Sequence, residues 1–364
     1  MFKFLLVLLL TPTLLLSQVD FNQINKNTDK LINNFLKSNQ VPGISISVSY
    51  NDSVYYSKGF GYSDIDKKIK VCPSKTKFRI GSITKTITSL TLAKLVELDS
   101  IQLNQNVEFY LDSLPKMKYR FTIKELGGHL TGLPRNPTVE SFDCSNIYKR
   151  KEFYNLLVVD TLNFIPSSKF YYSNYGFKML GLVIEKEYGK SITISQKELI
   201  LDKLKMYNTV PDINVYDANT TIFYTKLKDT IIKAPCQDCH FKYSEGCYLS
   251  TSEDLIKLGN GILYHNILNS SIAKTFIESQ KLEDNTETDY GIGFVSKKDK
   301  YKNFYFGHDG KFIGGSGMLR IYPKSGLVIS ILANFEDLNY DNILSYIAKN
   351  YINEINRTLS FKEE

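Results

Sequence analysis

The sequence of 364 residues contains no tryptophan, only 4 histidines and 5 cysteines, and no long block of lysine and arginine. Without a basic block, a nucleic-acid-binding arm is not indicated, although 45 basic residues against 38 acidic ones give a net charge of +7. No internal repeat or low-complexity linker is present. Apolar residues make up 43% and charged residues 23%, which excludes a disordered chain, a collagen and a coiled coil.

Only one long apolar run is present, and it lies at the start of the chain. Met1–Lys3 is basic, Phe4–Leu16 is almost purely apolar, and Ser17 suits a cleavage site. We interpret residues 1–17 as a signal peptide, which predicts a secreted or periplasmic protein with a net charge of +6 after one lysine is removed. The alternative is an uncleaved N-terminal anchor. The run is shorter than the roughly 20 residues of a spanning helix, so we expect no stable membrane span after processing.

Strand patterns gather at both ends of the remaining chain, and helical patterns lie between them. A helical spacing over 21–37 precedes a hairpin with strands at 44–50 and 54–62. The C-terminal part contains four short strand patterns and a last amphipathic helix, at 291–295, 304–307, 316–322, 327–333 and 340–356. This order predicts an α/β (α+β) fold with one antiparallel sheet from both chain ends, flanked by helices, and an inserted, mostly helical lobe.

We therefore expect one domain over residues 18–360 rather than two independent ones. Its sheet lobe would comprise about 20–80 and 285–360, and its helical lobe about 81–284. A cleft between two lobes is a usual place for a functional site.

A serine and a lysine three residues apart open the helical pattern that runs from Ser82 to about Leu98. Positions i and i+3 share one helix face, so Ser82 and Lys85 can point into the same space. Burial penalises a charged amine, so a neutral Lys85 could accept the Ser82 proton during nucleophilic attack. The spacing alone is weak, because it occurs at Ser74/Lys77, Ser82/Lys85, Ser113/Lys116 and Ser271/Lys274. Only Ser82 follows a glycine at the start of a long apolar-faced helix.

A second element is Tyr172-Ser173-Asn174, which precedes an apolar helix expected over 177–184. A tyrosine near a cationic lysine has a lowered pKa and can carry protons, and the Asn174 amide can bind a substrate carbonyl or hold Lys85. Tyr-x-Asn is common in this chain, starting also at Tyr264, Tyr301, Tyr340 and Tyr351. The helix that follows distinguishes the copy at Tyr172.

The third element should come from a strand beside the serine helix, and two segments compete for it. His308-Asp309-Gly310 follows an expected strand and precedes Lys311 and a glycine-rich stretch, which would let a substrate approach closely. Lys324-Ser325-Gly326 follows Pro323 between two strand patterns, where a tight turn is expected. We favour the histidine segment and interpret the lysine segment as a turn.

Ser82-Ile83-Thr84-Lys85, Tyr172-Ser173-Asn174 and His308-Asp309-Gly310, in this order, resemble the three motifs of the serine β-lactamase and penicillin-binding-protein superfamily. The second and third motifs are most similar to the class C β-lactamase-related group, which includes D-Ala-D-Ala carboxypeptidases, D-aminopeptidases and esterases. In detail the chain resembles the serine β-lactamase-like proteins. Further matching segments begin at Val41, Phe78, His129 and Gly246, and the resemblance covers about residues 25–350.

The resemblance implies a sheet lobe and a helical lobe with the active site in the cleft between them. By the family's roles, Ser82 would be the nucleophile, Lys85 the proton acceptor and Tyr172 the proton carrier to the leaving group. The backbone amides of Ser82 and Lys311 would form the oxyanion hole.

The substrate-binding residues implied by the resemblance are Asn174 for the substrate carbonyl, and His308, Gly310 and Lys311 along the third motif. Two positions depart from the family pattern. His308 stands where true lactamases and carboxypeptidases usually carry lysine, and a neutral histidine holds a carboxylate less firmly, which argues against penicillin hydrolysis. Cys247 stands where the group often has glycine.

The cysteines are Cys72, Cys144, Cys236, Cys239 and Cys247, and their odd number leaves at least one thiol unpaired in an exported chain. Cys236-x-x-Cys239-His240 spells a haem-attachment string, and with Cys247 these residues could also bind zinc. Both signals are weak, so we expect no cofactor and no metal, only a local disulfide or free thiols with the pairing left open. We interpret His129 as structural and His265 as a surface residue without a partner.

The leading interpretation is an exported serine hydrolase that forms an acyl-enzyme on Ser82 from an amide, peptide or ester carbonyl, as a peptidase, carboxypeptidase or esterase does. The alternatives are a true class C-like β-lactamase, a catalytically silent binding or scaffold protein of the same fold, and a haem or redox protein. Intact Ser82, Lys85 and Tyr172 argue against a scaffold. The expected partners are small peptide, ester or β-lactam substrates, cell-wall peptides among them, and not nucleic acid. The natural substrate and the oligomeric state stay open.

Overall fold

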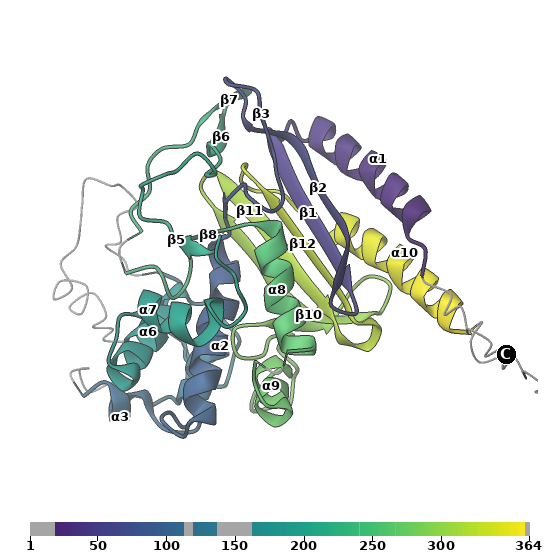
Figure 1. The fold of residues 1–364 in the computed structure, drawn as a ribbon. Coiled ribbons are helices and arrows are strands. Elements are labelled where there is room, and N and C mark those ends of the chain that lie inside the picture. Colours follow the sequence, from purple (N-terminus) through teal and green to yellow (C-terminus); the bar gives the residue numbers. More distant parts are fainter. Residues whose placement is uncertain (1–18, 113–118, 137–161, 240, 266, 361–364) are drawn as a thin grey trace, which may run out of the picture.

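The computed structural model describes residues 19–112, 119–136, 162–239, 241–265 and 267–360 (Figure 1). The predicted signal peptide lies outside these residues, as do Cys144, His240 and the Ser113/Lys116 pair. Within the described ranges, no helix is both long enough and apolar enough to cross a bilayer.

A seven-stranded antiparallel sheet forms the centre of the molecule, in the order β3-β2-β1-β12-β11-β10-β9. Its strands are β1 (Gly43–Tyr50), β2 (Ser53–Asp64), β3 (Ile69–Lys70), β9 (Val295–Lys298), β10 (Phe304–Phe312), β11 (Gly315–Tyr322) and β12 (Leu327–Ala333). Strand β1 pairs with β12, with Ile44 opposite Ala333. Strands from the two ends of the chain therefore meet in the middle of one sheet, which confirms the predicted fold class.

Strands β1 and β2 form the predicted hairpin, and Asn51 and Asp52 make its turn. Their φ angles are positive, 45° and 64°. Asparagine and aspartate tolerate this left-handed region better than other residues with a Cβ, which explains why the chain reverses there.

The structure differs from the prediction at two strands of the C-terminal part. Strand β10 continues past residue 307 because it pairs with β11 up to Phe312 opposite Gly315. The His308 motif therefore lies inside a strand, not after one. The expected strand over 291–295 is wrong: Gly293 has a φ of +75°, which interrupts an extended backbone, and β9 begins only at Val295.

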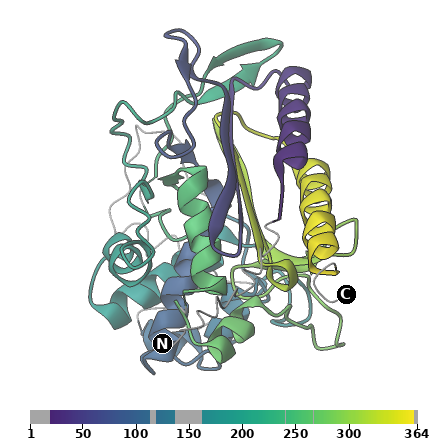
Figure 2. The same cartoon turned by 45° about the vertical axis from the view of Figure 1, so that its right-hand side comes forward.

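Helices cover both faces of the sheet (Figures 1 and 2). Helices α1 (Asn22–Ser38) and α10 (Asp341–Ser360) lie side by side on one face. Helix α8 (Ser252–Leu263) packs on the other face against β1, β11 and β12, and α2 (Thr84–Glu97) contacts β10. Two apolar cores result, one on each side of the sheet.

The inserted lobe contains the other helices, α3 (Val107–Tyr110), α4 (Ile123–Gly127), α6 (Asn174–Tyr188), α7 (Ile192–Gln196), η2 (Lys197–Leu201) and α9 (Ser270–Ile277). It is less purely helical than predicted. A three-stranded sheet joins β4 (Phe78–Arg79), β8 (Tyr248–Ser250) and β5 (Val210–Pro211), and a hairpin joins β6 (Tyr224–Leu227) and β7 (Thr230–Lys233). Helices α2 and α6 pack against each other, so residues at their starts can meet.

Candidate active site

Ser82 lies in a short 3₁₀ turn, η1 (Gly81–Ile83), directly before α2 begins. From the sequence we expected the helix to begin at Ser82, whereas the structure places Ser82 in the turn before it. Gly81 has a φ of +49°, and a Cβ there would lie 2.7 Å from the backbone nitrogen of Lys311. Only glycine fits such a close approach, and it brings the backbones of the Ser82 turn and of β10 together.

Lys85 is fully buried in the first turn of α2 and is held by three acceptors. Its Nζ donates to Ser82 Oγ (3.1 Å), to Asn174 Oδ1 (2.8 Å) and to the backbone carbonyl of Glu245 (2.8 Å). These contacts fix the lysine nitrogen beside the serine hydroxyl, as the i, i+3 spacing predicts.

Burial lowers the pKa of Lys85 to about 7, because an enclosed ammonium loses its hydration. The neighbouring charges oppose one another: Glu245 and Asp309 raise this pKa, whereas Lys178 and Arg135 lower it. At neutral pH a large share of Lys85 is therefore a free amine, the form that can accept a proton.

Asn174 is held in place by the cap of α6. The preceding Ser173 is the N-cap residue, and its Oγ accepts a hydrogen bond from the backbone nitrogen of Gly176 (3.0 Å). The cap makes Asn174 the first residue of the helix, which begins three residues before the predicted start. Asn174 Oδ1 accepts from Lys85, and its Nδ2 donates to Asn136 Oδ1 (2.8 Å).

The hydroxyl of Tyr172 is enclosed, although the edge of its ring is partly exposed. Burial raises the pKa of Tyr172 above its ordinary value, and the nearby Ser82 hydroxyl opposes this rise only in part. The expectation of a lowered pKa is therefore wrong. A phenolate would lose its hydration there, and the lysine that should stabilise it is largely uncharged. Tyr172 is neutral at physiological pH and can donate a proton.

His308 is buried on β10, and its Nε2 lies 2.8 Å from the hydroxyl of Tyr290. Burial lowers the pKa of His308 to about 4, while the exposed Asp309 beside it opposes the change. The imidazole is therefore uncharged at neutral pH. A substrate carboxylate would meet a neutral group here.

Among the described residues, β9 pairs with β10 only over residues 304–307, so beyond Gly307 this edge of β10 has no strand partner. The strand lies tightly against the serine turn: a Cβ at Gly310 would be 1.9 Å from the carbonyl oxygen of Ile80. An uncovered strand edge can pair with an extended substrate, as in β-strand addition.

The competing segments have other places in the fold. Lys324 belongs to the 3₁₀ turn η3 (Pro323–Ser325), which is followed by Gly326 at a φ of +62° and joins β11 to β12, so the predicted turn is confirmed. Of the other Ser-x-x-Lys pairs that the structure describes, one places Lys77 against Asp217 at the surface and the other has an exposed lysine on α9. Of the Ser-x-x-Lys lysines that the structure describes, only Lys85 is fully buried.

Two cavities meet at Ser82. The larger, about 410 Å³, is lined by Tyr172, Tyr290 and His308, and the smaller, about 300 Å³, by Gly246, Cys247 and Phe312. Asn174 and Lys311 line both. A carbonyl at Ser82 would therefore have room for a substituent on each side, and of the two cavities only the larger is lined by Tyr172.

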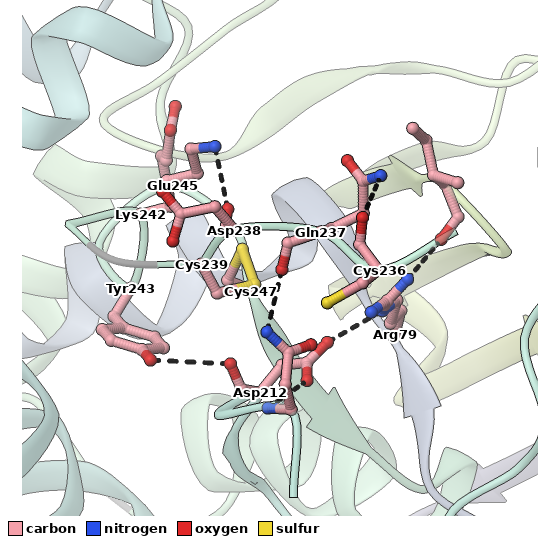
Figure 3. Close-up of a disulfide and its surroundings, with 12 residues drawn as sticks. Arg79, Asp212, Cys236, Gln237, Asp238, Cys239, Lys242, Tyr243, Glu245 and Cys247 are labelled. Carbon is pink, nitrogen blue, oxygen red and sulfur yellow. Dashed lines mark hydrogen bonds and ion pairs between the residues drawn. A yellow bond between two sulfur atoms is a disulfide. The ribbon is translucent and has the colours of Figure 1, made fainter. Parts of the chain in front are cut away.

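A disulfide joins Cys239 to Cys247 beside the smaller cavity (Figure 3). Cys72 is a free thiol. Because Cys239 and Cys247 are bonded to each other, they cannot both be thiolate ligands, which rules out the zinc alternative as stated. Among the residues in the structure, no group of three or more His, Cys, Asp or Glu is arranged to hold a metal ion.

His129 packs against the ring of Tyr172. It is buried, its Nδ1 accepts the backbone N–H of Ser173 (3.1 Å), and its ring centroid is 4.3 Å from that of Tyr172. Burial lowers the pKa of His129 well below its ordinary value, so it packs as a neutral ring. His265 is exposed as predicted, but it has a partner: its Nε2 lies 2.9 Å from Asp52 in the β1–β2 turn.

Three residues near the site were missed from the sequence: Tyr290, Lys178 and Glu245. Tyr290 lies in a loop and belongs to no motif. Lys178 had a signal, because a lysine inside an otherwise apolar helix pattern must find a buried partner. That partner is the Glu245 carboxylate, 3.2 Å away.

Comparisons with known proteins show the family of this chain. The family model described as Beta-lactamase matches residues 28–348. Protein flp of Staphylococcus aureus is 26% identical over 345 residues, which cover 91% of this chain and 67% of that protein. The human mitochondrial serine beta-lactamase-like protein LACTB is 24% identical over 418 residues, covering 84% of this chain and 76% of that protein.

A solved structure of the D-amino acid amidase from Ochrobactrum anthropi, complexed with D-phenylalanine, has a TM-score of 0.77 to this chain. The match covers 94% of this chain and all of that one at 17% identity. At this identity the likeness shows the fold.

Proposed function

The chain belongs to the beta-lactamase family and is a serine hydrolase, and from that premise we propose that it transfers an acyl group to water through an acyl-enzyme on Ser82. The observation that carries the proposal is the buried Lys85 amine, whose Nζ lies 3.1 Å from Ser82 Oγ. A base poised near neutral pH and within hydrogen-bond reach of a hydroxyl is what nucleophilic catalysis by serine requires.

In the first half of the reaction, Ser82 Oγ attacks the substrate carbonyl carbon and its proton passes to neutral Lys85. The carbonyl oxygen becomes an oxyanion, and the backbone amides of Ser82 and Lys311 stabilise it. The Asn174 side chain, already oriented by Lys85 and Asn136, binds the carbonyl of the neighbouring substrate group.

The leaving group then departs with a proton. Tyr172 supplies it and is reprotonated from Lys85, so the lysine returns to the free amine. In the second half, water attacks the acyl-enzyme and its proton passes to Lys85. The lysine then gives this proton to Ser82 Oγ as the acyl–oxygen bond breaks, which releases the acid product and restores the free amine. The raised pKa of Tyr172 supports a role as proton donor and not as a standing phenolate.

The bond that is cleaved is an amide, peptide or ester bond, of the kind hydrolysed by peptidases, carboxypeptidases and esterases. The neutral His308 supports this choice over penicillin hydrolysis, because it offers no fixed cation to a substrate carboxylate. The amidase named above acts, by its name, on amides. A true class C-like β-lactamase is the second candidate, and the intact Ser82, Lys85 and Tyr172 arrangement supports it equally.

Export is part of the proposal and rests on the apolar character of residues 1–17. It would place the site where small peptides and esters, including those of the cell wall, are met outside the cytoplasm. Finding the full-length chain retained in the cytoplasm after expression in its own cell would contradict this part alone.

The experiment is active-site labelling of the purified protein with a fluorophosphonate and with a fluorescent penicillin. We expect labelling of the wild type by at least one probe and its loss in Ser82→Ala, with folding checked by thermal unfolding. A folded wild type that neither probe labels would favour the catalytically silent scaffold. Turnover of nitrocefin, a D-Ala-D-Ala peptide and p-nitrophenyl esters on the same preparation then separates lactamase, carboxypeptidase and esterase.

A further inference from the structure

Helix α6 carries two polar side chains that reach the same neighbourhood. Asn174 and Lys178 are four residues apart and so lie on one face of the helix. Asn174 contacts the Lys85 amine, and Lys178 contacts the Glu245 carboxylate. One turn of α6 thus contacts both Lys85, the lysine beside Ser82, and the carboxylate of Glu245.

Glu245 is attached to both lysines through different groups. Its backbone carbonyl accepts a hydrogen bond from Lys85 Nζ (2.8 Å), and its Oε1 lies 3.2 Å from Lys178 Nζ. The side chains of Lys178 and Glu245 are only 2% and 7% exposed, so water screens neither charge effectively. The second carboxylate oxygen, Oε2, is enclosed and makes no hydrogen bond. Glu245 also lies on the loop that the Cys239–Cys247 disulfide closes (Figure 3).

We propose that the buried Lys178–Glu245 ion pair keeps the charge around Lys85 balanced, so that burial can leave Lys85 as a free amine, and that Lys178 and Glu245 are therefore positioning residues for the acylation step. The inference rests on the proposed function of Ser82 and Lys85. Neither member of the pair is assigned a contact with substrate: each acts on Lys85 through its charge.

Two lysine nitrogens and one carboxylate, those of Lys85, Lys178 and Glu245, lie in one enclosed region. Glu245 alone would hold a proton on Lys85, and Lys178 alone would repel it, as the opposite directions of their effects on the Lys85 pKa indicate. Their effects oppose each other, and burial, the largest cause of the lowered pKa, leaves the amine free near neutral pH. The other charged groups facing Lys85 are Asp309 on β10 and Arg135 on the loop before α6, which are exposed and better screened.

Among the described residues, the remaining titratable groups around Lys85 are Tyr172, His129 and His308. All three are neutral at pH 7, because burial raises the pKa of the tyrosine and lowers the pKa of each histidine. They contribute no competing titration in the range where Lys85 changes its charge.

Removing the charge of Lys178 should therefore shift the pH dependence of acylation in one direction, and removing the charge of Glu245 should shift it in the other. In Lys178→Gln the carboxylate is no longer balanced, so Lys85 keeps its proton longer and the midpoint of the rate rises by about one pH unit. The labelling rate then falls about fivefold at pH 7 and by up to about tenfold at lower pH. In Glu245→Gln the ammonium is no longer balanced, and the midpoint falls by a similar amount. The backbone carbonyl that accepts from Lys85 is kept in both.

The test is the second-order rate of Ser82 labelling by the fluorophosphonate, measured from about pH 5 to about pH 9. Glutamine can still hydrogen-bond to the remaining partner in each variant, which favours folding. Lys178→Arg preserves the charge and should keep the wild-type midpoint, and the double variant Lys178→Gln/Glu245→Gln should return close to it. Lys186→Met removes an exposed cation of the same helix, paired with Asp112 at 3.4 Å, and should leave the midpoint unchanged.

Opposite shifts in the two single variants support the inference, since a merely structural role would lower the rate without moving the midpoint. Midpoints that stay at the wild-type value, or that move in the same direction, overturn it. If the glutamine variants do not fold, Lys178→Met replaces them: a midpoint above that of Lys178→Arg supports the inference, and an equal midpoint overturns it. An unlabelled wild type would overturn the proposed function, whereas normal labelling with fixed midpoints overturns this inference alone.

Discussion

The two faces of strand β1 are both buried, yet they are built from different chemistry. Ile44, Ile46 and Val48 point into the core under α1 and α10, and all three are completely buried. Around β1 this side consists of hydrocarbon and aromatic rings, and farther along the sheet it also contains the buried Arg320 of β11, which pairs with Asp341 of α10. It contains no residue of the proposed active site.

The other face of β1 carries Ser45, Ser47 and Ser49, which are equally buried. Ser45 and Ser47 bond to the hydroxyl of Ser252 on α8 at 2.7 and 2.8 Å, and Ser49 donates to Asn260 Oδ1 at 2.8 Å. Small hydroxyl side chains let α8 approach the strand closely while every one of these groups keeps a partner.

The difference teaches that the molecule separates stability from chemistry. The face of β1 toward α1 and α10, here called the outer side, supplies apolar burial, and losing that burial lowers the free energy of unfolding. The face toward α8 is called the inner side. The inner side holds buried polar groups, which must stay paired, and continues through the helical lobe to Lys85 and its acceptors. Changes on the inner side should therefore affect the reaction more than the fold, and changes on the outer side the reverse.

The largest effect expected from this comparison is on the reaction. Lys85→Met removes the proton acceptor while keeping a side chain of similar length, so the Ser82 labelling rate should fall by about 10²–10⁴-fold. In the wild type this rate should rise with pH through about 7, as the buried ammonium of Lys85 loses its proton. Lys94→Met, later on the same helix, is the control and should label normally. Wild-type labelling by folded Lys85→Met would refute the assigned role.

The next effect is on stability and belongs to the outer side. Ile46→Ala deletes buried methyl groups and leaves a cavity, so the free energy of unfolding should fall by about 2–4 kcal/mol. Urea unfolding measures it, with the exposed Val54→Ala on β2 as a control that changes little. The remaining folded protein should still label at the wild-type rate. A large loss of labelling per folded molecule would show that the two sides are not separate.

The smallest effect is on the polar face. Ser49→Ala leaves the buried Asn260 Oδ1 without its donor, which should cost about 1 kcal/mol of unfolding free energy. Ser360→Ala is the control, because Ser360 is exposed and donates to the backbone carbonyl of Arg357 at the surface. Equal stability of Ser49→Ala and the control would mean that the inner hydrogen bonds contribute little.

Much of this arrangement could be predicted from residues alone, because local rules were enough for it. The period-two pattern of β1 and the Asn51-Asp52 turn gave the hairpin, and the glycine before Ser82 gave the start of the serine helix. The i, i+3 spacing predicted that Lys85 would reach Ser82. The pairing of strands from both ends followed from their positions in the chain.

What could not be predicted depends on contacts between distant segments. The alternation in β1 is normally typical of one solvent face, and only the approach of α8 makes the serine face buried. The direction of the Tyr172 pKa depends on how tightly the site closes, which spacing does not reveal. The extension of β10 to Phe312 comes from its pairing with β11 and so required the sheet.

The pairing of β1 with β12 also affects how the chain reaches its folded state. Ile44 and Ala333 are about 290 positions apart, so the central pair of the sheet is among the last contacts that a growing chain can make. Until β12 has been synthesised, the hairpin made at the beginning has one uncovered edge, which is able to pair with another chain. A chain that stopped before Leu327 would keep that edge permanently.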